Sequence, residues 1–511
     1  MTTFTTLSEM IAQQAPDAVA MTAPSGVPFS YGGLHQLISR TTTTLNGLGI
    51  GRGDRVGIVL PNCPEMACAF VAVASACTAA PLNMAYRAEE FEFYLNDLKA
   101  KALIVAQGSE SPALAVAAKL GLLVLELQPL PEQGAGNFSL SAQGAVSARA
   151  PVPGGLAQAQ DVALILHTSG TTSRPKIVPL SHRNVCASAR NVSTTLGLDA
   201  ADRELHIMPL FHIHGLIAGV LAPLAVGSRI FVTPGFNALR FFGWMKECQP
   251  TWYTAVPTMH QAILARAAGN AEVIKTNPLR FIRSSSSSMP PQVITELERV
   301  FNAPVIESYG MTEAAHQMAS SPLPPARRIP GSVGVAAGPE LAIMDNAGAL
   351  LKAGATGEVV IRGDNVTAGY ENNPLANAEA FADGWFRTGD QGVLDADGYL
   401  TLTGRLKEII NRGGEKISPR EVDEVLMDHP AVAQVVTFAM PHDKLGEEVA
   451  AAVVLREGQQ LTERELRDFV AGRLADFKVP KKILFLAEIP QGATGKLQRI
   501  GLAAKLGLGG S

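Results

Sequence analysis

The sequence predicts an α/β protein with a large N-terminal domain and a small C-terminal α+β domain. Through roughly the first 300 residues, short β-rich runs alternate with longer helical stretches, which is typical of parallel sheets covered by helices. From about residue 341 the pattern changes to alternating strands and turns, which predicts an added β-subdomain. After residue 404 a further mixed pattern covers about a hundred residues, enough for a separate small domain.

The expected elements follow from the apolar runs and the breaks between them. We expect helices over 66–80, 114–120, 420–426 and 462–474. We expect strands over 55–60, 102–105, 163–167, 229–232, 252–256, 281–283, 304–307, 341–344, 357–362, 398–403, 432–438 and 450–455. The stretch 131–155 is poor in periodicity and contains proline and glycine, so we expect a surface excursion there. The domain boundaries are then 1–404 and 408–511, with 405–407 as the connection.

Length and composition narrow the class of protein. A chain of 511 residues exceeds one ordinary core, and 47% apolar with 17% charged residues is typical of a globular enzyme. A formal charge of −4 argues against a nucleic acid partner. Five cysteines without a CxxC spacing predict free thiols in a reducing compartment. Without a signal peptide, a peroxisomal address or a run long enough for membrane insertion, we expect a cytoplasmic location.

The strongest functional signal is residues 167–176, which read HTSGTTSRPK. A glycine among hydroxyl side chains allows backbone N–H groups to approach phosphate, and the hydroxyls add donors. The loop also follows a strand, where such folds bind ligands. A Walker loop is excluded because Lys176 follows proline instead of preceding Ser or Thr at a helix start. A plain polar surface loop is the alternative. The candidate phosphate-binding residues are Thr168, Ser169, Gly170, Thr171, Thr172 and Lys176.

A second motif is Tyr309-Gly310-Met311-Thr312-Glu313, after the strand expected over 304–307. An aromatic ring can stack on a purine, a threonine can donate to phosphate, and a carboxylate can hold Mg²⁺. A strand-end turn with an incidental glutamate is an equally good interpretation of these five residues alone.

Three later motifs are weaker in isolation. Asp390, in FRTGD, has the planar two-oxygen acceptor that suits two ribose hydroxyls, but Gly-Asp is usually a turn. Gly413 and Gly414 permit close backbone approach to a thin ligand or form a simple hairpin turn. Lys496, on a glycine-flanked loop, can meet negative charge that builds at phosphorus, or it is an ordinary tail lysine.

In this order, the motifs resemble the signatures of the adenylate-forming (ANL) superfamily, which includes acyl-CoA synthetases, 4-coumarate–CoA ligases, luciferases and peptide-synthetase adenylation domains. The resemblance runs from GDRV at 53–56 to Lys496, with Ile177 where many members carry glycine. It implies the ANL fold with a mobile small domain. It also implies an AMP-forming ligase that uses ATP, Mg²⁺ and coenzyme A to convert a small carboxylic acid into an acyl-adenylate and then a thioester.

The resemblance also implies a role for each motif. Thr312 would bind the α-phosphate, Glu313 the Mg²⁺ ion, and Asp390 with Arg405 the ribose. Lys407 would be the hinge between two poses of the small domain. Lys496 would catalyse adenylation, and the Gly413-Gly414 loop would line the pantetheine tunnel in the second pose. Further nucleotide contacts would come from Ser286, Ser287, Glu307, Ser308 and Tyr309.

In relatives, the acid pocket lies between three segments. They correspond here to residues 209–212, the segment before the strand that holds Tyr309, and the residues just after Glu313. This chain places His212, His214, His316 and a run of five serines, including Ser288, there. Around a fatty tail these polar groups would stay unpaired, at about 1–3 kcal/mol each, whereas a second carboxylate would satisfy them. No arginine is obvious in the pocket, so we expect His214, His316 and serine hydroxyls to bind that carboxylate. Alternatively, His212 only gates the pocket and the serines bond one another.

Residues 167–176, 212–219, 307–323 and 405–419 are similar to oxalate–CoA ligases of plants and fungi. We therefore expect oxalate as the acid, then malonate, then a hydroxycinnamate or a medium-chain acid. A carrier-protein-loading adenylation enzyme and a non-catalytic nucleotide-binding protein are the other hypotheses. The reaction needs no protein nucleophile, so no cysteine has a role. The sequence leaves open whether the protein is a monomer or a homodimer.

Overall fold

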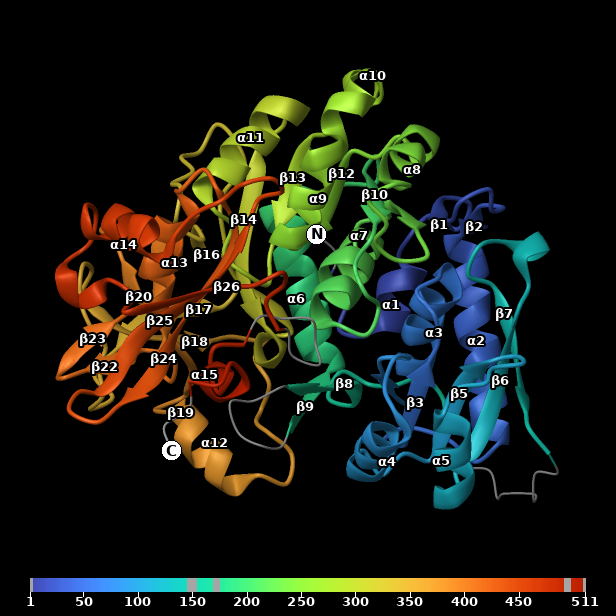
Figure 1. Ribbon diagram of the computed structural model, residues 1–511. Coiled ribbons are helices and arrows are strands. Elements are labelled where there is room, and N and C mark those ends of the chain that lie inside the picture. The colour runs from blue at the N-terminus through green and yellow to red at the C-terminus, as the bar shows by residue number, and fades with distance from the viewer. Residues whose placement is uncertain (1–2, 145–153, 169–174, 491–497, 509–511) are drawn as a thin grey trace. The chain divides into compact units, whose positions relative to one another are not determined.

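The computed structural model describes residues 3–144, 154–168, 175–490 and 498–508 (Figure 1). Five predicted site residues lie outside these ranges: Ser169, Gly170, Thr171, Thr172 and Lys496. The described chain divides into two compact units. The first comprises Met1–Thr168, Pro175–Leu341 and Ile361–Phe386, and the second comprises Ala342–Val360 and Arg387–Ser511. The domain boundary near 404 stays a prediction.

The first unit begins with a mainly parallel seven-stranded sheet, in the order β7-β6-β5-β3-β4-β8-β9. Only the outer pairs β6–β7 and β8–β9 are antiparallel. The strands are β3 (Arg55–Val59), β4 (Thr78–Pro81), β5 (Ala102–Ala106), β6 (Leu123–Pro129), β7 (Phe138–Ala142), β8 (Val162–Thr168) and β9 (Lys176–Ser181). Helices α4 (Ala88–Asp97) and α5 (Ala113–Leu120) pack against one apolar cluster of this sheet, and α2 (Tyr31–Gly47) packs against α3 (Pro64–Ala74).

The second sheet of this unit has nine strands, in the order β16-β15-β14-β13-β12-β10-β11-β1-β2. Its central strands are parallel and largely buried, and among their apolar residues they carry the buried polar side chains Glu204, His206 and Arg283. The strands are β1 (Val19–Thr22), β2 (Phe29–Ser30), β10 (Arg203–His206), β11 (Arg229–Val232), β12 (Trp252–Ala255), β13 (Phe281–Ser284), β14 (Val305–Met311), β15 (His316–Ser320) and β16 (Val335–Ala336).

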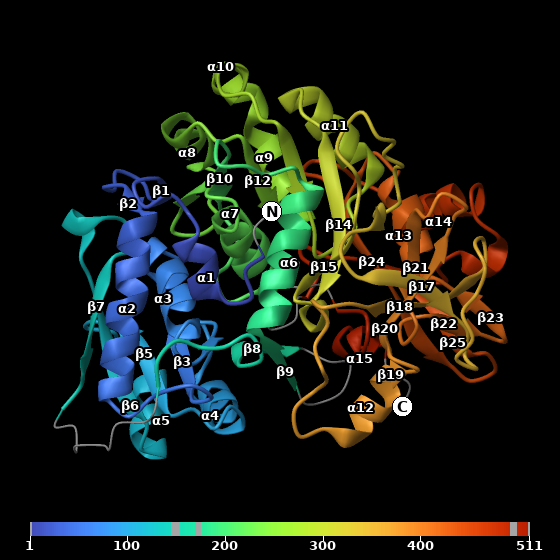
Figure 2. The same cartoon turned by 180° about the vertical axis from the view of Figure 1, so that it is seen from behind.

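Helix α6 (His182–Thr195) lies between the two sheets in both views (Figures 1 and 2). It contacts β8 and β9 of one sheet and β15 of the other. Together with a π-helix over His214–Leu221 and α7 (Ala222–Leu224), it covers one face of the nine-stranded sheet. Helices α8 (Phe241–Cys248), α9 (Pro257–Ala267) and α11 (Pro291–Phe301) cover the opposite face. The remaining helices of the unit are α1 (Leu7–Ala12), α10 (Ala271–Thr276) and α12 (Pro374–Ala380).

A five-stranded sheet follows in sequence, in the order β17-β18-β20-β19 with β21 paired to β20. Its strands are β17 (Glu340–Met344), β18 (Thr356–Arg362), β19 (Phe381–Ala382), β20 (Trp385–Leu394) and β21 (Leu400–Arg405). The last sheet has the order β23-β22-β25-β24, with β26 paired to β25. It comprises β22 (Ile410–Arg412), β23 (Glu415–Ile417), β24 (Val432–His442), β25 (Gly446–Leu455) and β26 (Lys482–Phe485), with helices α13 (Pro419–Met427), α14 (Glu463–Ala471) and α15 (Leu502–Lys505).

Two expected elements are wrong. The helix expected over 66–80 ends at Ala74, because the chain turns back and Thr78–Pro81 pairs in parallel with β3. The excursion expected over 131–155 contains β7, which pairs antiparallel with β6, so tertiary pairing overrides its weak periodicity. Among the described residues, no helix has the length and apolar character needed to cross a bilayer.

Candidate active site

The described flanks of the hydroxyl-rich loop form a β-hairpin. Thr168 at the end of β8 pairs with Lys176 at the start of β9. His167 is held nearby by a contact of 3.0 Å between its Nε2 and Oδ2 of Asp97. The side chain of Ile177, which replaces the family glycine, is 4% exposed and packs in the apolar cluster of the seven-stranded sheet. The hairpin therefore places Thr168 and Lys176 opposite each other where the two strands meet the loop.

The second motif lies within a strand instead of after one. Strand β14 continues through Tyr309 to Met311, and Thr312 begins a single 3-10 turn over Thr312–Ala314. The strand is longer than predicted because β15 pairs back against it, with Met311 opposite His316. Gly310 is required there, because a Cβ would lie 1.8 Å from the carbonyl oxygen of His316. Glu313 is 6% exposed, and its Oε1 accepts a hydrogen bond of 2.8 Å from the hydroxyl of Tyr370.

The predicted acid-pocket histidines meet in the interior, around an arginine that the sequence analysis missed. The rings of His214 and His316 stack with centroids 4.9 Å apart. Arg283, on β13, is fully buried, and its Nη1 and Nη2 lie 3.3 Å from Nε2 of His214 and 3.1 Å from Nε2 of His316. Thr254 and Gln317 complete the set of partners, at 3.3 and 3.2 Å. The expectation that no arginine serves this pocket is therefore wrong.

Arg283 is a buried cation whose hydrogen-bond partners among the described residues include no carboxylate. Its Nε finds no hydrogen-bond partner within the part of the chain that the structure describes. Burial lowers the pKa of Arg283 to about 9, while the charge of Glu204 raises it. Since a buried cation is unfavourable when no carboxylate hydrogen-bonds to it, and Glu204 acts on Arg283 only through its charge, the cluster is suited to receive an anion.

His214 faces this cation in its neutral form. Burial lowers the pKa of His214 well below its ordinary value, and the neighbouring His316 and Arg283 lower it further. A neutral His214 can accept at Nε2 from Thr254, 2.6 Å away, with Arg283 close by at 3.3 Å, and donate from Nδ1 to the hydroxyl of Ser286 at 3.0 Å. His214 thus links the serine run to the buried arginine.

The serine run divides between two environments. Ser284 and Ser285 are buried, and the hydroxyl of Ser285 donates to the carbonyl of Ser308 at 2.9 Å. Ser287 and Ser288 are exposed, so of the predicted serine contacts the structure brings only Ser286 to the histidines.

The other predicted residues of this unit lie around the same strand ends. Glu307 and Tyr309 are 8% and 9% exposed on β14. The Met289 amide donates to Oε1 of Glu307 at 3.4 Å. His212, half-buried just before the π-helix, has its ring 4.5 Å from that of Phe211.

A buried glutamate–histidine pair on β10 was not predicted. Glu204 and His206 are two positions apart, so their side chains lie on one face of the strand, and Oε1 of Glu204 is 3.3 Å from Nδ1 of His206. Burial raises the pKa of Glu204, and the charges of His206 and Arg283 lower it. Gly219 of the π-helix makes room for the pair, since a Cβ there would lie 2.4 Å from the His206 ring.

The second unit holds the predicted ribose and hinge residues. Asp390 on β20 pairs in register with Arg405 on β21, and Nε of Arg405 donates to Oδ1 of Asp390 at 2.9 Å. Lys407 is exposed in the turn after β21. Gly413 and Gly414 form the turn between β22 and β23 with φ of 58° and 101°. The hairpin-turn interpretation of this pair is thus confirmed, while its role toward coenzyme A stays a prediction.

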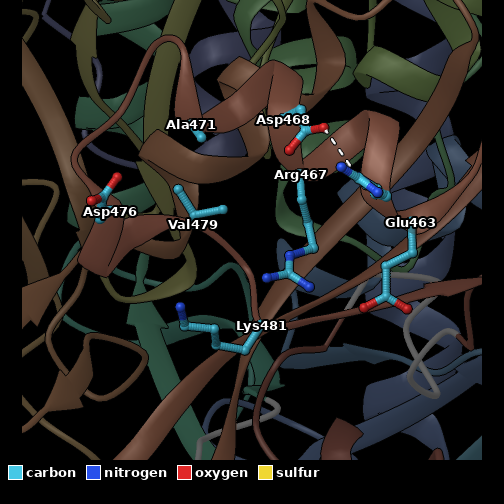
Figure 3. A pocket seen from close by; sticks show the side chains of 8 residues that line it. Glu463, Arg467, Asp468, Ala471, Asp476, Val479 and Lys481 are labelled. Carbon is cyan, nitrogen blue, oxygen red and sulfur yellow. Dashed lines mark ion pairs between the residues drawn. The ribbon is translucent and has the colours of Figure 1, made fainter.

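The second unit also carries an open groove of about 690 Å³ beside α14. Figure 3 shows acidic and basic side chains mixed around it, including Glu463, Arg467, Asp468 and Lys481. The groove contains no predicted site residue, and its mixed charge favours neither an anion nor a cation.

Comparison with known proteins identifies the family of the chain. Residues 8–371 match the model of the AMP-binding enzyme family, and residues 421–496 match that of its C-terminal domain. The chain belongs to the AMP-binding enzyme family. The oxalate–CoA ligase of Arabidopsis thaliana is 45% identical over 97% of both chains, and that of Saccharomyces cerevisiae is 40% identical over 96% of this chain and 94% of its own.

Solved structures of family members agree in fold. The ATP-bound structure of MatB from Rhodopseudomonas palustris superposes with a TM-score of 0.87, at 28% identity, over 98% of this chain and 99% of that chain. The expected ANL fold is confirmed, with its parallel-rich sheets in the large part of the chain.

Two residues that contact predicted site residues, Arg283 and Tyr370, were missed from the sequence. Arg283 is a charged residue inside a short apolar strand, and such a residue is rarely buried without a specific partner, so that signal was available. Tyr370 lies 57 positions after its partner Glu313 in sequence, and only the folded chain brings them together.

Proposed function

We propose that this family member is an ATP-dependent, AMP-forming oxalate–CoA ligase. The observation that carries the proposal is Arg283, a buried cation whose hydrogen-bond partners among the described residues are all neutral side chains or histidines and include no carboxylate. A short dicarboxylic acid presents one carboxylate for activation and a second for this cluster. The oxalate–CoA ligases of a plant and a yeast, at 45% and 40% identity, support the choice of acid.

In the first half-reaction, a carboxylate oxygen of oxalate attacks the α-phosphorus of ATP, and the bond to pyrophosphate breaks. Arg283 would hold the second carboxylate, so that the reacting carboxylate is oriented and not merely bound. Thr312 and Lys176 would donate to phosphate oxygens, and Lys496 would offset the charge that builds at phosphorus. In the second half-reaction, the thiol of coenzyme A attacks the acyl carbon and AMP leaves.

Glu313 fits the role of the Mg²⁺ ligand. Its carboxylate is almost fully buried, and its bond from Tyr370 comes from a neutral hydroxyl, which orients the carboxylate without neutralising its charge. Mg²⁺ is usually bound by one or two carboxylates together with substrate phosphates. Bound there, the ion would neutralise phosphate charge during adenylation.

The proposal is tested by AMP formation with coenzyme A and each of four acids: oxalate, malonate, coumarate and octanoate. We expect oxalate to give the highest kcat/KM. A preference for coumarate or octanoate would contradict the pocket argument while leaving the family unchanged. Malonate is the second candidate, because it also offers a second carboxylate to Arg283. Activity that needs a carrier protein in place of free coenzyme A would favour a carrier-loading enzyme.

A further inference from the structure

We infer that Tyr370 is a positioning residue that joins the predicted Mg²⁺ carboxylate, Glu313, to the predicted phosphate lysine, Lys176. The inference rests on the proposed function, because it assumes that Glu313 and Lys176 both serve ATP. These two residues belong to motifs 137 positions apart, and Tyr370 belongs to neither.

One side chain contacts both groups in different ways. The Tyr370 hydroxyl donates to Oε1 of Glu313 at 2.8 Å, and Nζ of Lys176 lies 4.3 Å from the centre of the Tyr370 ring. A neutral donor orients a carboxylate, and a ring face attracts an ammonium without occupying its N–H donors. Both contacts therefore leave the charges of Glu313 and Lys176 available to a nucleotide.

The backbone around Tyr370 is tied to both motifs as well. The amide of Thr367 donates to the carbonyl of Glu313 at 2.7 Å, and the hydroxyl of Thr367 donates to the carbonyl of Pro179 on β9 at 2.8 Å. The amide of Glu371 donates to the carbonyl of Ile177 at 3.1 Å. Residues 367–371 thus join the 3-10 turn of Glu313 to strand β9.

Tyr370 is itself fixed in place. Its amide donates to Oδ1 of Asn377 at 2.7 Å, and Nδ2 of Asn377 donates back to its carbonyl at 2.8 Å. The side chain is almost fully buried, at 8% exposed. A residue held on both backbone groups cannot follow its partners, so it sets the distance between them. The metal carboxylate and the phosphate lysine are thereby placed before ATP arrives.

Two substitutions separate the two contacts. Tyr370→Phe keeps the ring under Lys176 and removes only the hydroxyl, so we expect about tenfold weaker Mn²⁺ binding in the presence of a non-hydrolysable ATP analogue, measured by electron paramagnetic resonance on the full chain. Its KM for ATP at saturating Mg²⁺ should change less than about twofold. Tyr370→Leu also removes the ring, so its KM for ATP at saturating Mg²⁺ should be about threefold higher than that of Tyr370→Phe.

Tyr31→Phe is the matched control, since it also removes a buried tyrosine hydroxyl, one that donates to the carbonyl of Ser228 at 2.6 Å. It should leave Mn²⁺ binding unchanged. Glu313→Gln separates the two hypotheses. If it leaves Mn²⁺ binding intact, the proposed role of Glu313 is wrong. If it weakens binding while Tyr370→Phe does not, only the inference about Tyr370 is overturned. When Glu313→Gln is already present, adding Tyr370→Phe should not weaken Mn²⁺ binding any further, because the hydroxyl would act only through Glu313.

Discussion

In the proposed acid site, the single residue Arg283 would supply the positive charge. Replacing it with Met keeps most of the volume and removes a buried charge, so we expect the thermal unfolding midpoint to stay equal or to rise. The same change removes the partner of the second carboxylate, so kcat/KM for oxalate should fall by about 100-fold. Differential scanning fluorimetry and AMP release measure the two effects.

Arg362→Met is the control for this prediction, because the Arg362 side chain is 49% exposed in an ion pair with Glu340. It should change neither oxalate activation nor the unfolding midpoint by much. Unchanged oxalate kinetics in Arg283→Met would mean that the second carboxylate binds elsewhere.

Gly310 makes a prediction at the level of the β14–β15 pair. Gly310→Ala places a Cβ against the carbonyl of His316, which must move, so we expect a loss of about 2 kcal/mol or more in unfolding free energy and a higher KM for oxalate. Gly47→Ala, at the end of α2 with open space around its Cβ, is the control and should be neutral or slightly stabilising. A wild-type KM in Gly310→Ala would show that the position of His316 does not matter.

Helices and strands with a clear run of apolar residues could be predicted from the sequence. Strands that depend on hydrogen bonds to distant parts of the chain could not. Strand β11 begins and ends at the predicted residues, because its three apolar residues, 230–232, lie between the breaks at Gly227 and Pro234. In contrast, β4 and β7 have weak local signals and exist because β3 and β6 supply hydrogen-bonding partners. The same limit applies to the site. His214 and His316 were predicted from their type and place, but Arg283 was missed because its hydrogen-bond partners come from three separate segments that only the folded chain brings together.

At the scale of the whole molecule, buried histidines make stability depend on pH. Burial lowers the pKa of His182 to about 4 and that of His260 to about 3, from 6.5. The unfolded chain binds a proton at each site below pH 6.5, whereas the folded chain does not until near pH 4. Stability is therefore complete above pH 6.5 and declines as pH falls, by about 1.4 kcal/mol per histidine at pH 5.5. Urea unfolding at pH 7.5 and 5.5 measures this, and equal midpoints would contradict it.

The two-domain scheme makes the second prediction at this scale. Lys496→Ala should slow adenylate formation by about 1000-fold, because its charge is needed only while negative charge builds at phosphorus. Thioester formation from a supplied acyl-adenylate and coenzyme A should be nearly unchanged. Lys505→Ala, in α15, is the control and should affect neither step. Equal loss of both steps in Lys496→Ala would show that one pose serves the whole reaction.

The π-helix over His214–Leu221 has a consequence for how substrate range can change. A π-helix has more residues in each turn than an α-helix. The direction of the His214 ring therefore depends on how many residues this helix contains. Removing one residue would let the coil tighten and rotate the imidazole by about 100° relative to the residues that follow. A one-residue deletion in this coil is therefore expected to change how the site holds its acid without substituting any of the residues that contact it.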